Sequence, residues 1–226
     1  MGWFTKRSAS SSVGDTANTT IETPDSDTTV PVDADHGPWD SASRDTTHGY
    51  IDCGSVKIPR VPGIQLAMVT AGNMMTPIAV SVVVAESRIL ARAFAAPKNR
   101  DLWPELATTI ADTAGNEGAT VLSRGEGRWG EELVLNIPMT APNGNTVTQP
   151  RRVIGIDGSR WMLRLDIDGR AAIDEEAMGR ISGFIDDIVV ERGNHAAVPT
   201  TLLPLRPPTE PGATTVDETN QVTSES

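Results

Sequence analysis

The sequence predicts an α+β fold in which a mostly antiparallel sheet packs against two main helices. Three observations lead to this class. Short apolar or alternating segments follow one another at turn-length spacing between residues 49 and 169, two other segments repeat apolar residues with helical periodicity, and polar stretches flank this central region on both sides. Strands joined by short loops pair antiparallel, so we expect the helices to cover the sheet rather than to connect parallel strands.

Composition divides the chain into three parts. Residues 1–48 are a Ser/Thr-rich arm in which three basic and eight acidic residues leave a charge of −5. Such a segment buries too little apolar area to fold, so we predict disorder, with a docking segment at 36–40 around Trp39. Residues 49–204 are the single α+β domain, long enough for one core. Residues 205–226, rich in Pro and Thr with a charge of −3, are predicted to be a disordered tail.

The first half of the domain is predicted to consist of strands. Residues 50–58 and 64–69 are short apolar segments that end at turn residues. Residues 78–85 are nearly continuous in β-branched side chains, which is typical of a central strand covered on both faces. Residues 88–95 form a further strand that ends before Pro97.

Two segments predict helices. Asp101 is a suitable N-cap for a helix over 102–114, where apolar residues recur every four positions. Asp174 is the predicted N-cap of the second helix, and Glu175 and Glu176 then lie in its first turn, where the helix dipole favours acidic side chains.

More strands are predicted between these helices. Asn143-Gly144 is a hairpin signal, and Asp157-Gly158 is predicted to be a turn. The predicted strands are residues 120–124, 131–137, 147–149, 151–156 and 160–168. The last has the clearest alternation in the sequence, which predicts a half-buried antiparallel strand. Trp161, Leu163, Leu165 and Ile167 lie on one face of it, and Arg160, Met162, Arg164, Asp166 and Asp168 on the other.

The core resembles an actinobacterial family of domains of unknown function that is often encoded near the gene for dUTPase. The matching stretches are residues 37–40, 49–59, 93–97, 102–103, 150–153 and 155–161, so the resemblance covers about 36–204. Cys53 departs from the aliphatic residue expected in the family pattern. The resemblance implies no established activity, cofactor or site. The order of strands and helices is also similar to that of PsbP-like α/β/α sandwiches.

Charge and hydropathy argue against two classes of partner. The net charge is −11, whereas nucleic acids and anionic membranes require clustered Lys and Arg. The longest apolar run, residues 78–85, is far shorter than the ~20 residues that span a bilayer, and no secretory signal is visible. One cysteine fits a reducing compartment, so we expect a cytoplasmic protein. Residues 1–7 are a candidate for weak membrane contact.

The sequence predicts no catalytic residue, cofactor or metal site. His36, His48 and His195 lie in or beside the predicted flexible flanks, so a general base inside the core is not expected. The carboxylates of Asp166 and Asp168 point the same way and could share a proton or bind a cation. The simpler interpretation is that arginines on the same face pair with them.

One basic and aromatic set is the candidate ligand site. Arg151, Arg152, Arg160 and Arg164 lie on two predicted strands joined by a turn, so some are expected to converge, with Arg128 and Trp129 joining from the preceding loop. Such a group could hold a phosphate and stack a base. The alternative is that the arginines pair with Asp166, Asp168 and Glu131.

These observations lead to a hypothesis and two alternatives. The leading hypothesis is a non-enzymatic binding or scaffold module with a protein partner. The first alternative is a nucleotide- or phospho-ligand-binding protein, with or without catalysis, that uses the arginine-rich hairpin. The second is regulation through phosphorylation of the Ser/Thr-rich arm.

Overall fold

The computed structural model describes residues 36–72, 76–209 and 214–217. The predicted membrane contact of residues 1–7 and most of the predicted disordered arm fall outside these ranges.

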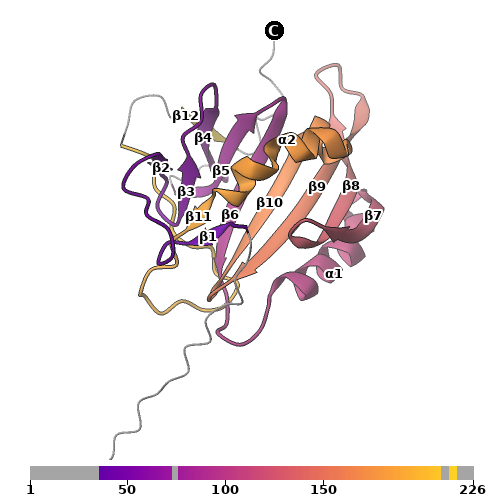
Figure 1. The fold of residues 1–226 in the computed structure, drawn as a ribbon. Helices are drawn as coiled ribbons and strands as arrows, with labels where there is room; N and C mark the ends of the chain where they lie inside the picture. The colour runs from indigo at the N-terminus through magenta and orange to yellow at the C-terminus, as the bar shows by residue number, and fades with distance from the viewer. Residues whose placement is uncertain (1–35, 73–75, 210–213, 218–226) are drawn as a thin grey trace, which may run out of the picture. The chain divides into compact units, whose positions relative to one another are not determined.

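The larger of two sheets has eight strands in the order β12-β4-β5-β6-β10-β9-β8-β7 (Figure 1). Neighbouring strands are antiparallel, apart from β12 and β4, which are parallel. The strands are β4 (Gln65–Thr70), β5 (Pro77–Val84), β6 (Ser87–Ala95), β7 (Thr120–Gly127), β8 (Gly130–Thr140), β9 (Thr146–Gly158), β10 (Trp161–Gly169) and β12 (Thr214–Asp217). The mostly antiparallel sheet predicted from the sequence is therefore confirmed.

The smaller sheet has the order β1-β11-β3-β2. Its strands are β1 (Trp39–Asp40), β2 (Tyr50–Asp52), β3 (Val56–Pro59) and β11 (Val189–Val190). The single strand predicted over 50–58 is wrong, because Gly54 adopts a φ of +88° and the chain turns back there. Trp39 and Asp40 pair with β11, so the segment 36–40 contributes an edge strand to the fold.

Two α-helices and two short 3₁₀ segments complete the described structure. They are α1 (Trp103–Ala114), η1 (Gly115–Glu117), η2 (Arg170–Ala172) and α2 (Glu175–Asp186). Asp174 caps α2 as predicted, because its carboxylate accepts hydrogen bonds from the backbone N–H groups of Glu176 and Ala177. Neither helix in the described ranges is long and apolar enough to cross a membrane. The predicted α+β class with two main helices agrees with this structure.

The two helices pack on opposite faces of the large sheet. Trp103 and Ala107 of α1 share a buried cluster with Val153 and Met162. Residues of α2 share a second cluster with the other face of β10 and with the small sheet, and Figure 1 shows α2 lying across these strands. This second cluster includes Ile181, Ile185, Leu163, Leu165, Val56 and Val190. We call the two faces of the sheet the α1 face and the α2 face.

Strand β10 is buried on both faces, so the predicted half-buried strand is wrong. Met162 is 1% exposed, Asp166 1% and Asp168 4%, although all three point away from the α2 face. The alternation of the sequence is present, but the polar side chains of β10 are enclosed by ion pairs with neighbouring strands rather than by water.

Strand β9 is longer than predicted. The segments 147–149 and 151–156 form one continuous strand that runs through Asp157 and Gly158. The turn to β10 therefore falls at Ser159 and Arg160, where Arg160 adopts a φ of +67°.

The segment 200–206 lies at the boundary predicted between the domain and its tail. Its backbone bonds to β6, since Thr200 N–H donates to Ala95 and Leu203 N–H donates to Ala93. Leu203 and Leu205 are buried, and β12 further along pairs with β4. Backbone pairing and two leucines thus hold part of the predicted tail to the domain, despite its Pro- and Thr-rich composition.

The packing of α1 on β9 yields a testable prediction. A Cβ at Gly155 would overlap the indole of Trp103, so Gly155→Ala forces α1 away from the sheet. We expect a loss of about 1–3 kcal/mol in the free energy of unfolding, measured by urea denaturation. The matched control is Gly179→Ala, since a Cβ at that position of α2 meets no other atom within 4 Å and should stabilise the helix by about 0.5–1 kcal/mol. Equal effects of the two substitutions would contradict this packing.

Candidate functional site

The six residues of the predicted ligand site do not form a single site. Arg151 and Arg152 are adjacent on β9, and successive side chains of a strand point to opposite faces. Arg151 therefore lies on the α1 face and Arg152 on the α2 face. Arg160, in the turn before β10, is exposed and forms no ion pair with the residues that the structure describes.

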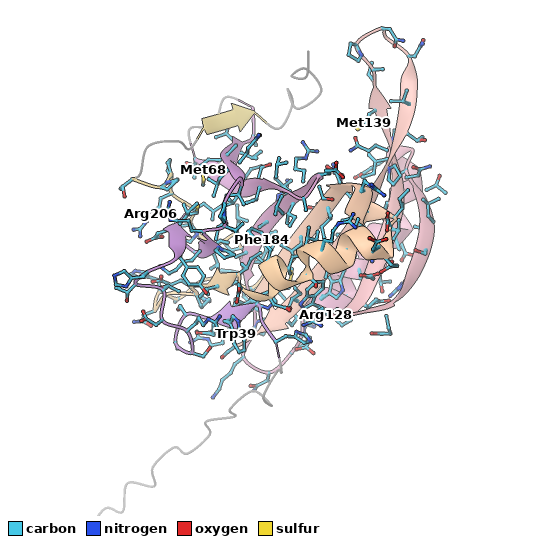
Figure 2. The ribbon with its side chains drawn as sticks, turned by 45° about the horizontal axis from the view of Figure 1, so that its top comes forward. Trp39, Met68, Arg128, Met139, Phe184 and Arg206 are labelled. Carbon is cyan, nitrogen blue, oxygen red and sulfur yellow. The ribbon has the colours of Figure 1, made fainter. Side chains whose placement is uncertain are left out.

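Arg128, Trp129 and Arg152 line a groove of about 600 Å³ between the β7–β8 hairpin and α2. Arg128, labelled in Figure 2, reaches the end of α2, where its NH2 group donates to Asp186 at 2.7 Å. The Trp129 indole N–H also donates to Asp186, at 2.9 Å, and to the carbonyl of Gly37 at 3.1 Å. The hairpin tip is thus fastened to α2 by groups that a ligand would otherwise use.

Arg152 is similarly occupied. It is 3% exposed, donates to Glu132 at 2.8 Å, and forms a short ion pair with Glu175. Burial raises the pKa of Glu132, which Arg152 opposes and the nearby Glu175 reinforces. The groove therefore has two carboxylates for its one buried arginine, which does not favour an anionic ligand. The expected partner of the arginines, Glu131, instead pairs with Arg124.

Arg151 and Arg164 belong to a different set, on the α1 face. Asp168 accepts from Arg151 at 2.7 Å and also pairs with Arg88 of β6. Asp166 accepts from Arg164 at 2.8 Å and from Arg92 of β6 at 2.7 Å. The strand registers require this, since β6 and β9 flank β10 on either side. The interpretation that arginines pair with these aspartates holds for Arg151 and Arg164 and not for Arg160.

We call these side chains the arginine face. It consists of Arg88, Arg92, Arg151, Arg164, Asp166 and Asp168. Its four guanidinium groups surround two carboxylates. The four arginine side chains are 15–26% exposed, so each is partly accessible to solvent.

Asp168 stays ionised for a physical reason. Burial alone would raise the pKa of Asp168, but hydrogen bonds and charge interactions with Arg151 and Arg88 outweigh it and hold this pKa below its usual value. Two guanidinium groups beside a carboxylate already stabilise its negative charge, so neither a shared proton nor a bound cation is required. The structure thus favours the charge-pairing interpretation of Asp166 and Asp168.

A pocket of about 410 Å³ opens where α1 meets the edge of the arginine face, and we call it the α1 pocket. Met162 and Leu102 form a buried apolar floor, and Arg164 brings the arginine face into the wall. Arg100 lies on the exposed rim, where it pairs with Glu105 at 3.5 Å. The lining residues are Phe94, Arg100, Leu102, Glu105, Leu106, Thr109, Met162, Arg164 and Thr200.

Asp157 fixes the start of α1 beside this pocket. Its two carboxylate oxygens accept the backbone N–H groups of Leu102 at 2.9 Å and Trp103 at 3.0 Å. Burial raises the pKa of Asp157, and these two donors oppose that shift. The predicted N-cap Asp101 is wrong, because a residue distant in sequence satisfies the first donors of the helix, where Leu102 is the N-cap.

Thr200 contributes backbone strain to the α1 pocket. It adopts a φ of +68°, a left-handed conformation that is rare for a β-branched residue. Its N–H donates to the carbonyl of Ala95, and the Ala95 N–H donates to the carbonyl of Thr201, so pairing with β6 holds the strained residue in place. Strain of this kind, roughly 1–3 kcal/mol, is frequent at binding sites.

Other reactive groups offer no competing site in the described ranges. There, no cluster of three or more His, Cys, Asp or Glu side chains could hold a metal ion. Burial raises the pKa of the Cys53 thiol to about 12, which leaves it protonated and unreactive at neutral pH.

The arginine face predicts a specific acid sensitivity. Because the folded pKa of Asp168 is below its unfolded value, its contribution to stability is full above about pH 4 and is lost as the pH falls through the folded pKa. Asp168→Asn should lower the free energy of unfolding at pH 7 by about 2 kcal/mol, less than for a fully buried pair because both arginines are partly exposed. Urea denaturation from pH 7 to pH 2.5 measures both effects.

The control for that experiment is Asp187→Asn. The side chain of Asp187 is 50% exposed and pairs with the exposed Arg44, so its loss should cost under about 0.5 kcal/mol. If Asp168→Asn leaves the stability at pH 7 and its fall below pH 4 unchanged, Asp168 is not held ionised by its arginines.

Comparison with known proteins gives one result. A family described as "Protein of unknown function (DUF3710)" matches residues 37–214, which span both sheets and both helices. No curated protein matches the chain.

Proposed function

The chain belongs to the DUF3710 family, whose description assigns no function, and we propose that it is a binding module that holds a small amphipathic anion in the α1 pocket. The observation that carries this proposal is one arginine, Arg164, at the wall of a pocket with an apolar floor. The ligand class is a carboxylate or phosphate monoester with an apolar body.

The shape and lining of the pocket support this ligand class. Small-molecule sites usually enclose about 300–1,000 Å³ and combine an apolar lining with a few polar groups. The α1 pocket, at about 410 Å³, has this composition. Phe94, Leu106 and Met162 would contact the apolar body, because removing apolar surface from water is favourable.

Charge supports an anion rather than a neutral ligand. Arg164 at the pocket wall binds Asp166 through its Nε and one terminal nitrogen. Arg164 carries donors beyond the two that bind Asp166, because a guanidinium has five N–H groups. A ligand carboxylate or phosphate at this wall would accept hydrogen bonds from these remaining donors. Partial burial strengthens such a charge-assisted hydrogen bond.

The pocket supports binding rather than catalysis. Its lining contains neither His nor Cys, and its one carboxylate, Glu105, is exposed and paired with Arg100. The nucleotide alternative loses its main support, because the arginines proposed to cradle a phosphate lie on two faces of the sheet. Only Arg164 of the predicted set lines this pocket.

The remaining predictions from the sequence are part of this proposal. We propose a cytoplasmic location and a protein partner that responds to the ligand-bound state. An actinobacterial origin, a gene neighbourhood with dUTPase and a PsbP-like sandwich also remain proposals that rest on the resemblance of sequence motifs.

Titration calorimetry with decanoate and decyl phosphate tests the function. We expect binding in the micromolar to submillimolar range, with decanol at least about tenfold weaker because it lacks the charge. Arg164→Gln should weaken the anions by about tenfold and leave decanol unchanged. Leu106→Trp should weaken all three, because the larger side chain fills the pocket.

Two controls make this titration decisive. Arg180→Gln removes an exposed arginine of α2 that pairs with Glu176, and it should leave all affinities unchanged. Thermal unfolding of each variant confirms that it is folded, which matters for Arg164 because Asp166 loses a partner. The proposed function is refuted if the parent protein binds neither decanoate nor decyl phosphate, or if both anions bind equally well to the two pocket variants.

A further inference from the structure

A further groove lies between the loop 191–197 and the segment 201–206. We call this segment the strap and the groove the strap groove. Its volume is about 820 Å³, and Gly54 and Ser55, from the turn between β2 and β3, also line it. The strap groove shares no lining residue with the α1 pocket, so it is a separate candidate site.

Leu202 has an unpaired backbone edge in this groove. The residues on either side of it, Thr201 and Leu203, form backbone hydrogen bonds with β6. Because backbone groups alternate in direction along an extended segment, those of Leu202 point away from β6, as does the Pro204 carbonyl, which accepts the N–H of Ser55. The N–H and C=O of Leu202 have no hydrogen-bond partner in the part of the chain that the structure describes. An extended peptide can pair with such an edge.

The Ser55 hydroxyl is a second polar group of this groove with an unmade hydrogen bond. Ser55 is 4% exposed, and its Oγ has no partner among the described residues. Buried hydroxyl groups are ordinarily hydrogen-bonded, because an unmade bond of this kind is unfavourable. A hydroxyl both donates and accepts, so either a carbonyl or an N–H of a bound peptide would satisfy it.

Arg192 lines the groove with a guanidinium group that is held in place without a carboxylate. Its Nε donates to the carbonyl of Arg160 at 3.1 Å, and its NH1 group donates to the carbonyl of His195 at 3.0 Å. These two bonds fix the orientation of the planar group and leave its other N–H groups available. Within residues 36–72, 76–209 and 214–217, Arg192 forms no ion pair.

Two other ionisable side chains of the groove are already paired. Glu191 pairs with Lys57 at 2.9 Å. Arg206, labelled in Figure 2, pairs with Asp52. Arg192 is therefore the group best placed to select a ligand by charge, and a guanidinium matches a carboxylate through two parallel hydrogen bonds.

We propose that the strap groove binds the C-terminal residues of a partner protein. The peptide backbone pairs with Leu202 and the Ser55 hydroxyl, and the terminal carboxylate binds Arg192. A C-terminus is the part of a protein in which a carboxylate belongs to the main chain itself, and capture of this group is a recurring mode of peptide recognition. This inference states the chemistry of the protein partner and does not rest on a ligand in the α1 pocket.

An NMR titration of the full chain tests the site with two forms of one peptide. The probes are acetyl-Ala-Leu-Ala-Leu with a free terminal carboxylate and the same peptide with a terminal amide. We expect millimolar or tighter binding of the acid, with shifted amide signals at Ser55, Leu202 and residues 193–197. The amide form should bind about tenfold more weakly, because it offers Arg192 no charge.

Variants separate the parts of the site. Arg192→Gln should weaken the acid about tenfold and leave the amide form unchanged, which shows that the loop is intact. Ser55→Ala should weaken both forms about threefold, because it removes a hydrogen bond to the backbone. Arg180→Gln, an exposed arginine of α2, and Leu106→Trp, which fills the α1 pocket, should leave both affinities unchanged.

Four results would overturn the inference. Neither peptide form binds at millimolar concentration, or the two bind equally well. Shifts that lie outside the strap groove place the peptide elsewhere. Acetate that produces the same shifts at the same concentration assigns Arg192 to a small anion. If decanoate binds in the α1 pocket while the peptide does not bind, this inference fails and the proposed function stands; the opposite result refutes the proposed function alone.

Discussion

The pairing of two buried aspartates of β10 with arginines is the constraint on which the rest of the structure depends. Asp166 and Asp168 are nearly inaccessible to water, and arginines from β6, β9 and β10 surround both carboxylates. Breaking a buried ion pair typically costs about 3–5 kcal/mol, so this charge arrangement specifies the register of the three central strands.

The two faces of the sheet consequently have different chemistry. On the α2 face, the arginines are paired with carboxylates. Arg128 at the tip of the β7–β8 hairpin binds Asp186 of α2, and Arg152 of β9 binds Glu132 of β8 and Glu175 of α2. On the α1 face, Arg164 pairs with Asp166 and also lines the pocket beside α1. The proposed binding role therefore rests on the position of Arg164 rather than on the number of arginines.

The sequence predicted features that depend on local chemistry. The alternation of β10, the hairpin at Asn143-Gly144 and the cap Asp174 all follow from neighbouring residues, and the structure has each of them. It did not predict that Asp157 caps α1, because that contact spans more than fifty residues. It also combined Arg151 with Arg152, since the prediction relied on the proximity of the two strands and omitted the period-two geometry of β9. The α1 pocket joins residues of β6, β10 and α1, and no local pattern marks it.

A crystal structure of the protein with 10-bromodecanoate tests the central claim most directly, because anomalous scattering locates the bromine independently of the interpretation of density. The account predicts the carboxylate within hydrogen-bonding distance of Arg164 and the bromine among Phe94, Leu106 and Met162. A carboxylate bound instead beside Arg152 in the α2-side groove, or a bromine outside the α1 pocket, would contradict it.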